Sequence, residues 1–436
     1  MTSWKTSTLG AECSIAIGGT PARNRREFWD ENHIANNLWA SIADLRAKVL
    51  TSTDERLTNL GVAHSNAKLV MAGSVLLSFK LTLGRVAIAG TNLYTNEAIA
   101  ALTSETLDHE FLYYGLQSWD LLADVDQAIK GATLNKAKLR RIPIRFPEEG
   151  KIQRTLASTL AQVDQAIEQT EALLEKRQRI KTGLTRDLLT RGLDAQGRLR
   201  DPTTHCFKPS PLGSIPQEWV IGSLLDATDP TRQPILTGPF GADLGIDDFV
   251  EQGVPVLRIG NVQQGRLDFS DLLFVSAGKA EQLKKYTVRS GDLLFARQGA
   301  TTGRNALAND RAAGCLINYH IIRVALDHSR CAPVFIEAAF NSDSVQRQVD
   351  REKGRGTREG INTAQLKAIQ LKLAPVSEQR AIESVISVLS NQVNRTELSL
   401  AKLRRLRTGL MQDLLTGRVS VTPLLASSPP LVLANG

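Results

Sequence analysis

Two segments of this chain, separated by more than two hundred residues, carry nearly the same nine residues. Thr182–Thr190 is TGLTRDLLT and Thr408–Thr416 is TGLMQDLLT, so seven of the nine positions are identical at an offset of 226. Any two amphipathic helices share leucines, but a glycine inside a helix costs about 1 kcal/mol relative to alanine. The matching Gly183 and Gly409 therefore indicate an internal duplication, and they predict a packing requirement common to both copies.

Each repeated segment ends a long stretch in which apolar residues alternate at intervals of three and four. Sustained spacing of this kind makes a seam for a partner helix. The positions are Leu156, Leu160, Val163, Ile167, Leu174, Leu184 and Leu188 in the first stretch and Ile382, Ile386, Leu389, Val393, Leu400, Leu410 and Leu414 in the second, with Thr170 and Thr396 on the same spacing. Arg177 and Lys181 interrupt the first seam. We expect two helices of roughly 55–60 Å that pair as an antiparallel coiled coil, with a domain at each end.

The match continues upstream of both helices at an offset of 227. Residues 132–147 and 359–375 each predict a short helix, an alternating strand and a proline-marked start of the long helix. Fainter similarities link Gly73–Phe79 with Gly291–Arg297, and the residues from Asn96 to Ile99 with those from Asn318 to Ile321. The duplication therefore extends into the globular parts of the chain.

The predicted fold class is two α/β (α+β) domains, each followed by a long α-helix, related by an internal pseudo-two-fold repeat. The chain of 436 residues is too long for one ordinary core. The predicted boundaries are a first domain at 1–147, a helix at 148–192, a Gly- and Pro-rich linker at 193–215, a second domain at 216–375, a helix at 376–418 and a disordered tail at 419–436.

The net charge of +8 and the pI of about 9.3 favour a polyanionic partner. Two similar heads held apart by helices suit double-stranded DNA, and heads that have diverged within one chain suit an asymmetric, bipartite site. The candidate DNA-binding residues are basic side chains on loops: Arg23, Arg25, Arg26, Lys80 and Arg85 in the first domain, and Arg297, Arg304, Lys353, Arg355 and Arg358 in the second. Arginine can fork onto phosphate or guanine.

We find no catalytic motif. The chain has no Asn/Asp-Pro-Pro-aromatic tetrad, no phosphate-binding glycine loop and no histidine pair at metal-ligand spacing, so no catalytic or metal-binding residue is predicted. The four scattered cysteines lack a CxxC pair and fit a reducing cytoplasm. The absence of a long apolar run or a signal peptide argues against a membrane location. We expect a protein that directs an enzyme it does not itself contain.

The sequence resembles the specificity subunit of a type I restriction–modification enzyme over nearly its whole length. The motifs that carry the resemblance are, in chain order, Gly18–Pro21, Phe28–Trp29, Gly213–Trp219, Gly238–Gly241, Val256–Asn261, Gly291–Arg297 and Pro375–Arg380. The first helix start, around Glu148 and Glu149, departs from the Ser-Glu-Gln-Arg form found at the second.

The resemblance implies two target recognition domains, each reading half of a bipartite site, with the helices setting the gap. It also implies partners: two methyltransferase (modification) subunits docked on the helices and a restriction/translocase subunit. S-adenosylmethionine, ATP and Mg would bind those partners, and no cofactor is expected in this chain. The alternatives are a specificity subunit of a methylase–nuclease complex without a separate motor, a stand-alone DNA-modifying enzyme, and a coiled-coil scaffold.

Overall fold

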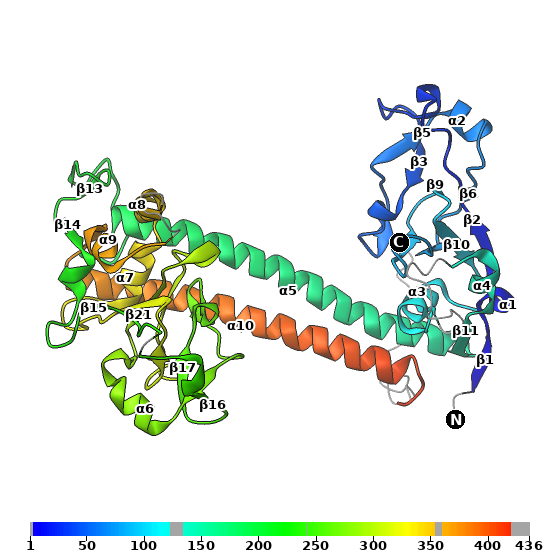
Figure 1. Cartoon of the computed structure of the whole chain (residues 1–436). Coiled ribbons are helices and arrows are strands. Elements are labelled where there is room, and N and C mark those ends of the chain that lie inside the picture. The colour runs from blue at the N-terminus through cyan, green and yellow to red at the C-terminus, as the bar shows by residue number, and fades with distance from the viewer. Residues whose placement is uncertain (1–2, 123–133, 242, 354–359, 420–436) are drawn as a thin grey trace. The chain divides into compact units, whose positions relative to one another are not determined.

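The computed structural model describes residues 3–122, 134–241, 243–353 and 360–419, and Figure 1 labels their helices and strands where there is room. The chain divides into two compact units. Unit 1 comprises Met1–Ala172 and Leu398–Gly436, and unit 2 comprises Leu173–Glu397. Each unit therefore contains one globular head and a part of each of the two long helices, α5 (Gly150–Arg191) and α10 (Val376–Leu414).

The head of unit 1 is built on two sheets. The larger has the strand order β2 (Ser14–Ile17), β10 (Ile99–Thr103), β7 (Val75–Ser78), β8 (Val86–Ala89) and β4 (Val49–Leu50). The smaller has the order β5 (Glu55–Leu57), β3 (Asn37–Ala40), β9 (Leu93–Thr95) and β6 (Leu69–Val70). The other elements are β1 (Trp4–Thr8), paired with β11 (Pro143–Pro147), and the helices α1 (Leu9–Glu12), α2 (Asn59–Ala63), α3 (His109–Ser118) and α4 (Lys136–Arg141).

The head of unit 2 repeats this plan. One sheet has the order β15 (Ile235–Thr237), β24 (Ile321–Val324), β21 (Leu293–Ala296) and β22 (Asn305–Leu307), and the other β16 (Phe249–Val250), β20 (Leu273–Val275), β17 (Val254–Leu257) and β23 (Leu316–Ile317). Three two-stranded pairs join β12 (Phe207–Lys208) with β13 (Ile215–Pro216), β14 (Val220–Ser223) with β25 (Gln370–Leu373), and β18 (Val262–Gln263) with β19 (Arg266–Leu267). Its helices are α6 (Ala277–Gln282), α7 (Pro333–Phe340), α8 (Asp343–Lys353) and α9 (Thr363–Ala368).

The short helices that lead into α5 and α10 begin in the same way. Asn135 caps α4 by accepting a hydrogen bond from the amide of Lys138 at 2.8 Å. Asn362, at the matching position, caps α9 by accepting from the amide of Gln365 at 2.9 Å. Asparagine is among the preferred N-cap residues because its side-chain oxygen satisfies one of the free amides of the first turn. The upstream repeat is thus a capped helix followed by a strand, β11 or β25.

Within each unit the two long helices lie antiparallel. In unit 1, Arg404 donates to Glu171 at 2.6 Å and Arg407 to Asp164 at 2.5 Å. In unit 2, Arg177 donates to the carbonyl of Gln392 and to the hydroxyl of Thr396. In unit 1 the later residue of α5 meets the earlier residue of α10, which is the antiparallel order. In unit 2 the order is the same, because Leu188, which follows Arg177, shares a core with Ile382, which precedes Gln392. Arg177, which breaks the apolar spacing, is thus accommodated by polar partners on the facing helix.

The helix ends explain the repeated nine residues. In unit 2, Leu188 and Leu189 of α5 lie in the same core as Trp219, Phe335, Ile382 and Ile386. In unit 1, Met411 and Leu414 of α10, with Leu415, lie in the core that contains Tyr114, Leu156 and Leu160. The repeated Leu-Leu pair is therefore a core element of a head. The predicted seam positions are all buried or half-buried in the unit that contains them.

The glycines of the repeat have a different environment from the one predicted. A methyl group added at Gly183 or at Gly409 would meet no heavy atom within 4 Å. Close packing among the described residues therefore does not require either glycine, and the predicted packing requirement within the chain was wrong. The segment predicted as a linker, residues 193–215, also contributes buried residues to unit 2. Leu193 and Ile215 are buried in the core of unit 2, and Arg200 is 8% exposed.

Candidate nucleic-acid interface

Three of the first head's predicted arginines lie on the loop between β2 and β3. Arg23 lies over the ring of Trp29, 3.8 Å from its centroid, and 4.9 Å from that of Trp39, while its guanidinium contacts Glu55. Stacking and pairing together hold this side chain in one orientation with half of its surface exposed. Arg25 is exposed and lies 3.7 Å from Glu27.

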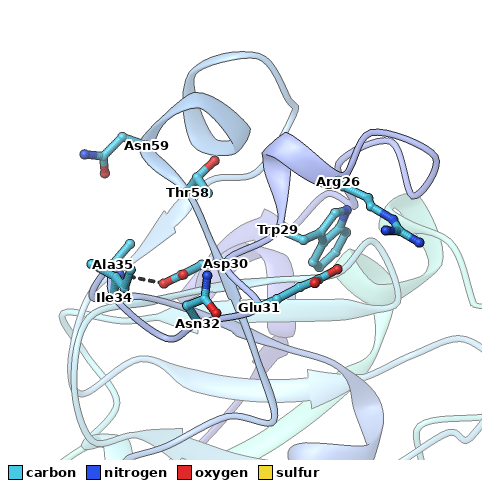
Figure 2. Close-up of a pocket in the computed structure, with 9 residues that line it drawn as sticks. All are labelled: Arg26, Trp29, Asp30, Glu31, Asn32, Ile34, Ala35, Thr58 and Asn59. Atoms are coloured by element: carbon cyan, nitrogen blue, oxygen red, sulfur yellow. Dashed lines mark hydrogen bonds between the residues drawn. The ribbon is translucent and has the colours of Figure 1, made fainter.

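Arg26 lines a hollow of about 610 Å³ in the first head (Figure 2). Trp29 lies beside it, and Asp30 lies on the floor, where its carboxylate accepts from the amide of Ala35. Burial acts to raise the pKa of Asp30, but the backbone amides of Ala35 and Ile34 bring that pKa below its ordinary value. The hollow therefore combines a cation, an aromatic face and an ionised acceptor.

A second group of polar side chains surrounds the start of β10. Thr20 donates to the carboxylate of Glu97. This bond and the nearby Lys80 and Arg23 hold the pKa of Glu97 below its ordinary value. Lys80 is half-buried, with its ammonium 5.4 Å from the ring centroid of Phe79. The exposed Arg85 donates to the carbonyl of Ile42 at 3.2 Å.

The corresponding part of the second head is aromatic. Arg297 donates to the carbonyl of Tyr319 at 3.3 Å, and its guanidinium lies 6.0 Å from the ring centroid of Phe240. The rings of Phe240 and Tyr319 are 6.3 Å apart, and His320 packs on Tyr319 at 3.7 Å. The side-chain oxygen of Gln298 lies 2.8 Å from Nδ1 of His320. Because that oxygen can only accept, the contact fits the tautomer in which Nδ1 carries the proton.

Of the other four basic residues predicted in the second head, two lie among the described residues. Arg304 is exposed and donates to Gln263 at 3.0 Å, and Lys353 pairs with Asp350 at 3.0 Å at the end of α8. Arg355 and Arg358 lie outside the described residues. A separate basic surface, which no sequence pattern indicated, surrounds a cavity of about 550 Å³ lined by Arg232, Lys284, Lys285, Arg289 and Arg323.

The loops of the two heads are held by the same backbone hydrogen bonds. The strand pairings match as well: β10 lies between β2 and β7 as β24 lies between β15 and β21, and β3 runs parallel to β9 as β17 does to β23. Four backbone bonds of the first head each have a counterpart in the second. In the first head they are Gly18 N to Ile99 O, Phe79 N to Ala98 O, Ser78 N to Arg85 O and Asn96 N to Ala40 O. The counterparts, in the same order, are Gly238 N to Ile321 O, Arg297 N to His320 O, Ala296 N to Arg304 O and Asn318 N to Leu257 O. The faint sequence similarities are therefore equivalent positions of one scaffold.

Two glycines and two asparagines maintain this scaffold. A side chain at Gly18 would lie 2.0 Å from the carbonyl oxygen of Thr95, and one at Gly238 would lie 2.1 Å from that of Asn318. Asn96 accepts from the amide of Ala98 at 3.0 Å, and Asn318 accepts from that of His320 at 3.2 Å. These residues place the loop after β2 or β15 against the turn that begins β10 or β24.

The structure also bears on the chemistry that the sequence argued against. Across the ranges described above, no three His, Cys, Asp or Glu side chains gather as a metal site. Each of the four cysteines is free, and burial raises the pKa of Cys13 and of Cys331 to about 12. In the part of the chain that the structure describes, no helix has the length and apolar character needed to cross a membrane.

The two heads share one scaffold, and both carry exposed basic side chains. The long helices contribute to the cores of both heads. These features define a duplicated recognition protein. Residues 1–176 and 247–403 match the type I restriction modification DNA specificity domain. The chain belongs to this family. Curated proteins that resemble it are named as type I restriction enzyme specificity subunits.

The chain is similar to several proteins of known name. It is 23% identical to the putative type I restriction enzyme MjaX specificity subunit of Methanocaldococcus jannaschii, over 48% of both chains. It is 24% identical to the type I restriction enzyme EcoKI specificity subunit of Escherichia coli K12, over 66% of this chain and 61% of the relative. These matches thus span about half to two thirds of the length of the relatives.

The fold resembles that of the type I restriction–modification S subunit from M. genitalium. The two share 14% identity and a TM-score of 0.60, over 95% of this chain and 96% of the other. A chain from a structure of complex assembly and conformational transition in a type I R-M system gives a TM-score of 0.52 at 16% identity, over 94% and 97% of the two chains.

Proposed function

We propose that this chain is the DNA specificity subunit of a type I restriction–modification complex. Each head reads one half of an asymmetric, bipartite site in double-stranded DNA. The observation that carries the proposal is that the family match falls into two stretches, one in each half of a duplicated chain. Exposed arginines on matching loops, Arg85 and Arg304 among them, supply the positive charge that phosphate contacts require.

The paired helices set the gap between the half-sites and dock two methyltransferase subunits. Support comes from Gly183 and Gly409. Glycine destabilises a helix relative to alanine, and no contact among the described residues requires a glycine at either position. Beside Gly183, the surface has a hollow of about 430 Å³ lined by residues of α5 from Glu175 to Arg186. A bare backbone at such a hollow leaves room for a partner's side chain.

The catalytic groups belong to the partners. The methyltransferase subunits bind S-adenosylmethionine, and a restriction/translocase subunit uses ATP and Mg, so this chain needs no cofactor of its own. The complex acts in the cytoplasm, where these partners meet DNA. Proteins that co-purify with the chain distinguish a complex with a separate motor subunit from one without it.

The test is to express the chain with and without a candidate methyltransferase subunit from the same genome, and to sequence the methylated positions in the host DNA. We expect one bipartite motif, with two short defined parts and unread bases between them, only when both proteins are present. The purified chain alone should transfer no methyl group and cut no DNA. Methylation or cleavage by the chain alone, or a continuous motif, contradicts the proposal.

A further inference from the structure

Two exposed positions on the common scaffold contact each other in both heads, with different chemistry. One follows β2 or β15 and is Thr20 or Phe240; the other follows the scaffold asparagine and is Glu97 or Tyr319. In the first head the pair is a hydroxyl and a carboxylate joined by a hydrogen bond. In the second it is two aromatic rings whose centroids are 6.3 Å apart.

The fold itself does not account for this difference. The backbone bonds around the two positions are the same in both heads, so the scaffold accepts either pair. Phe240 is 59% exposed and Tyr319 38% exposed, so neither ring is placed there by burial in the core. Thr20 and Glu97 are exposed as well. A pair that keeps its place and its exposure while changing its chemical class is suited to contact with a partner that differs between the heads.

The charge of Glu97 limits what it can contact on DNA. With its pKa lowered by the Thr20 hydroxyl and nearby cations, its carboxylate is ionised and can only accept hydrogen bonds. A phosphate offers no donor and would repel it. The amino groups at N4 of cytosine and N6 of adenine are donors on the major-groove edge of a base pair. A carboxylate set between Arg23 and Lys80 is therefore suited to a base edge.

The second head offers a different surface. Phe240 supplies an exposed apolar edge, which suits the 5-methyl group of thymine in the major groove. His320 has its Nδ1 proton directed to Gln298, and burial with the nearby Arg297 lowers its pKa, so Nε2 of the neutral ring is an acceptor. Tyr319 lies between Phe240 and His320 and contacts both rings.

On the turn after the neighbouring strand, β7 or β21, an exposed arginine is present in both heads. Arg85 and Arg304 each follow a glycine with positive φ, Gly84 or Gly303, and their carbonyls accept equivalent strand bonds. Phosphates are the same at every base pair, whereas base edges differ. An arginine common to both heads is therefore suited to contact a phosphate of the DNA backbone.

The geometry points to a division of contacts at this surface, resting on the proposed DNA-reading function. The Thr20–Glu97 pair of the first head and the Phe240–Tyr319 pair of the second read base edges in the major groove, and Arg85 and Arg304 contact phosphates. Glu97 accepts a hydrogen bond from an amino group of cytosine or adenine, and Phe240 contacts a thymine methyl.

The experiment uses the full chain in complex with its methyltransferase and measures methyl transfer on a DNA library in which every base of the site is varied. Glu97→Gln keeps the size of the side chain and its contact with Thr20 but adds a donor. We expect it to reduce discrimination about tenfold or more at one position of one half-site, and to leave the other half-site unchanged. Phe240→Ala should do the same at a thymine of the opposite half-site.

Two further variants test the phosphate contacts. Arg85→Ala and Arg304→Ala should weaken binding to all sites equally and reduce the dependence of log Kd on log salt by about one. Glu105→Gln and Ile246→Ala are matched controls, because both residues are exposed in the same heads and lie outside the pairs. Both controls should methylate the wild-type motif.

The outcomes separate this inference from the function on which it rests. A wild-type complex without a bipartite motif contradicts the proposed function. With that motif present, a Glu97→Gln complex that folds and retains full discrimination overturns the assignment of Glu97. An altered base preference in Arg85→Ala overturns the assignment of Arg85 to a phosphate. If Glu97→Gln lowers the melting temperature, Thr20→Ala provides the second variant: it should weaken discrimination at the same position as Glu97→Gln.

Discussion

At the scale of single residues, a repeated glutamine explains one part of the duplication. Gln153 is fully buried; it accepts from the amide of Asp108 at 2.7 Å and donates to the carbonyls of Thr106 and Pro147. Gln379, at the matching position, accepts from the amide of Ala332 and donates to the carbonyl of Ala374. Each glutamine thus links the start of a long helix to the N-terminus of an earlier helix, α3 or α7.

Removing this side chain leaves buried backbone groups without partners. We predict that Gln153→Ala lowers the free energy of unfolding by about 2 kcal/mol or more, and that the Asp108 amide exchanges its hydrogen faster. Thermal unfolding and hydrogen exchange measure the two effects. Gln162→Ala, on the exposed face of the same helix, should change stability little. Equal melting temperatures for the two variants would contradict this role.

Glu337 of α7 gives a prediction for pH. Burial raises its pKa, although the amide of Leu307 and the nearby Lys181 act against this. Because the folded pKa lies above the unfolded value, the folded state holds the proton more tightly, so stability falls as pH rises above about 4.5. Glu337→Gln should therefore be more stable than wild type near neutral pH, with the difference vanishing in acid. Chemical unfolding across that range, with Glu397→Gln as the exposed control, tests this; a constant difference would exclude it.

The sequence predicted some of these residues and missed others for a physical reason. Lys80, Arg85, Arg297 and Arg304 were chosen as candidates because a basic residue in a loop is visible in a sequence. Thr20 and Glu97 were missed because their partnership joins residues 77 positions apart and depends on how β2 and β10 pair. The exposure of Phe240 is equally a property of the fold.

At the scale of elements, α5 and α10 were predictable because their apolar spacing is local. The residues that contact these helices were harder to predict. Glu378, in the first turn of α10, accepts from the amide of Leu193 at 2.8 Å and from Arg200 at 2.6 Å and 3.0 Å. This nearly buried ion pair joins the end of α5 to the start of α10 within unit 2. The sequence did not predict this ion pair, because a Gly- and Pro-rich composition indicates a loop without showing which of its residues is buried.

The helical glycines give a prediction at this scale. Gly183→Ala and Gly409→Ala should each stabilise the isolated chain by about 0.5–1 kcal/mol, because alanine is the better helix former and its methyl group meets open space. If the helices dock methyltransferase subunits there, the double variant should bind them more weakly while melting at a higher temperature. Calorimetric titration with the partner measures the first effect. Unchanged affinity would place the docking surface elsewhere.

At the scale of the whole molecule, the shared scaffold predicts that each head acts independently. Replacing residues 1–147 with the first head of another family member should change one half-site and leave the other as it was. The long helices and the second head, which remain, keep the gap and the partners. Sequencing the methylated sites decides this; a change in both half-sites would show that the heads are coupled. The reverse replacement, of residues 216–375, is the matched control.

The helices offer the sharpest test of how the two half-sites are spaced. Ala172 and Leu398 are equivalent positions of the repeat, and the division between the units falls beside both. Seven residues inserted after each position keep the spacing of three and four, add about 10 Å and turn one head by roughly 20° relative to the other.

If the helix pair sets the gap, this double insertion should lengthen the unread part of the site by about three base pairs, at 3.4 Å each, with both half-sites unchanged. An insertion in α5 alone shifts the seam against α10 and should abolish assembly. Methylated-site sequencing reads out the gap directly. An unchanged gap in a complex that still methylates would mean that the DNA or the partner subunits, and not these helices, determine the distance between the half-sites.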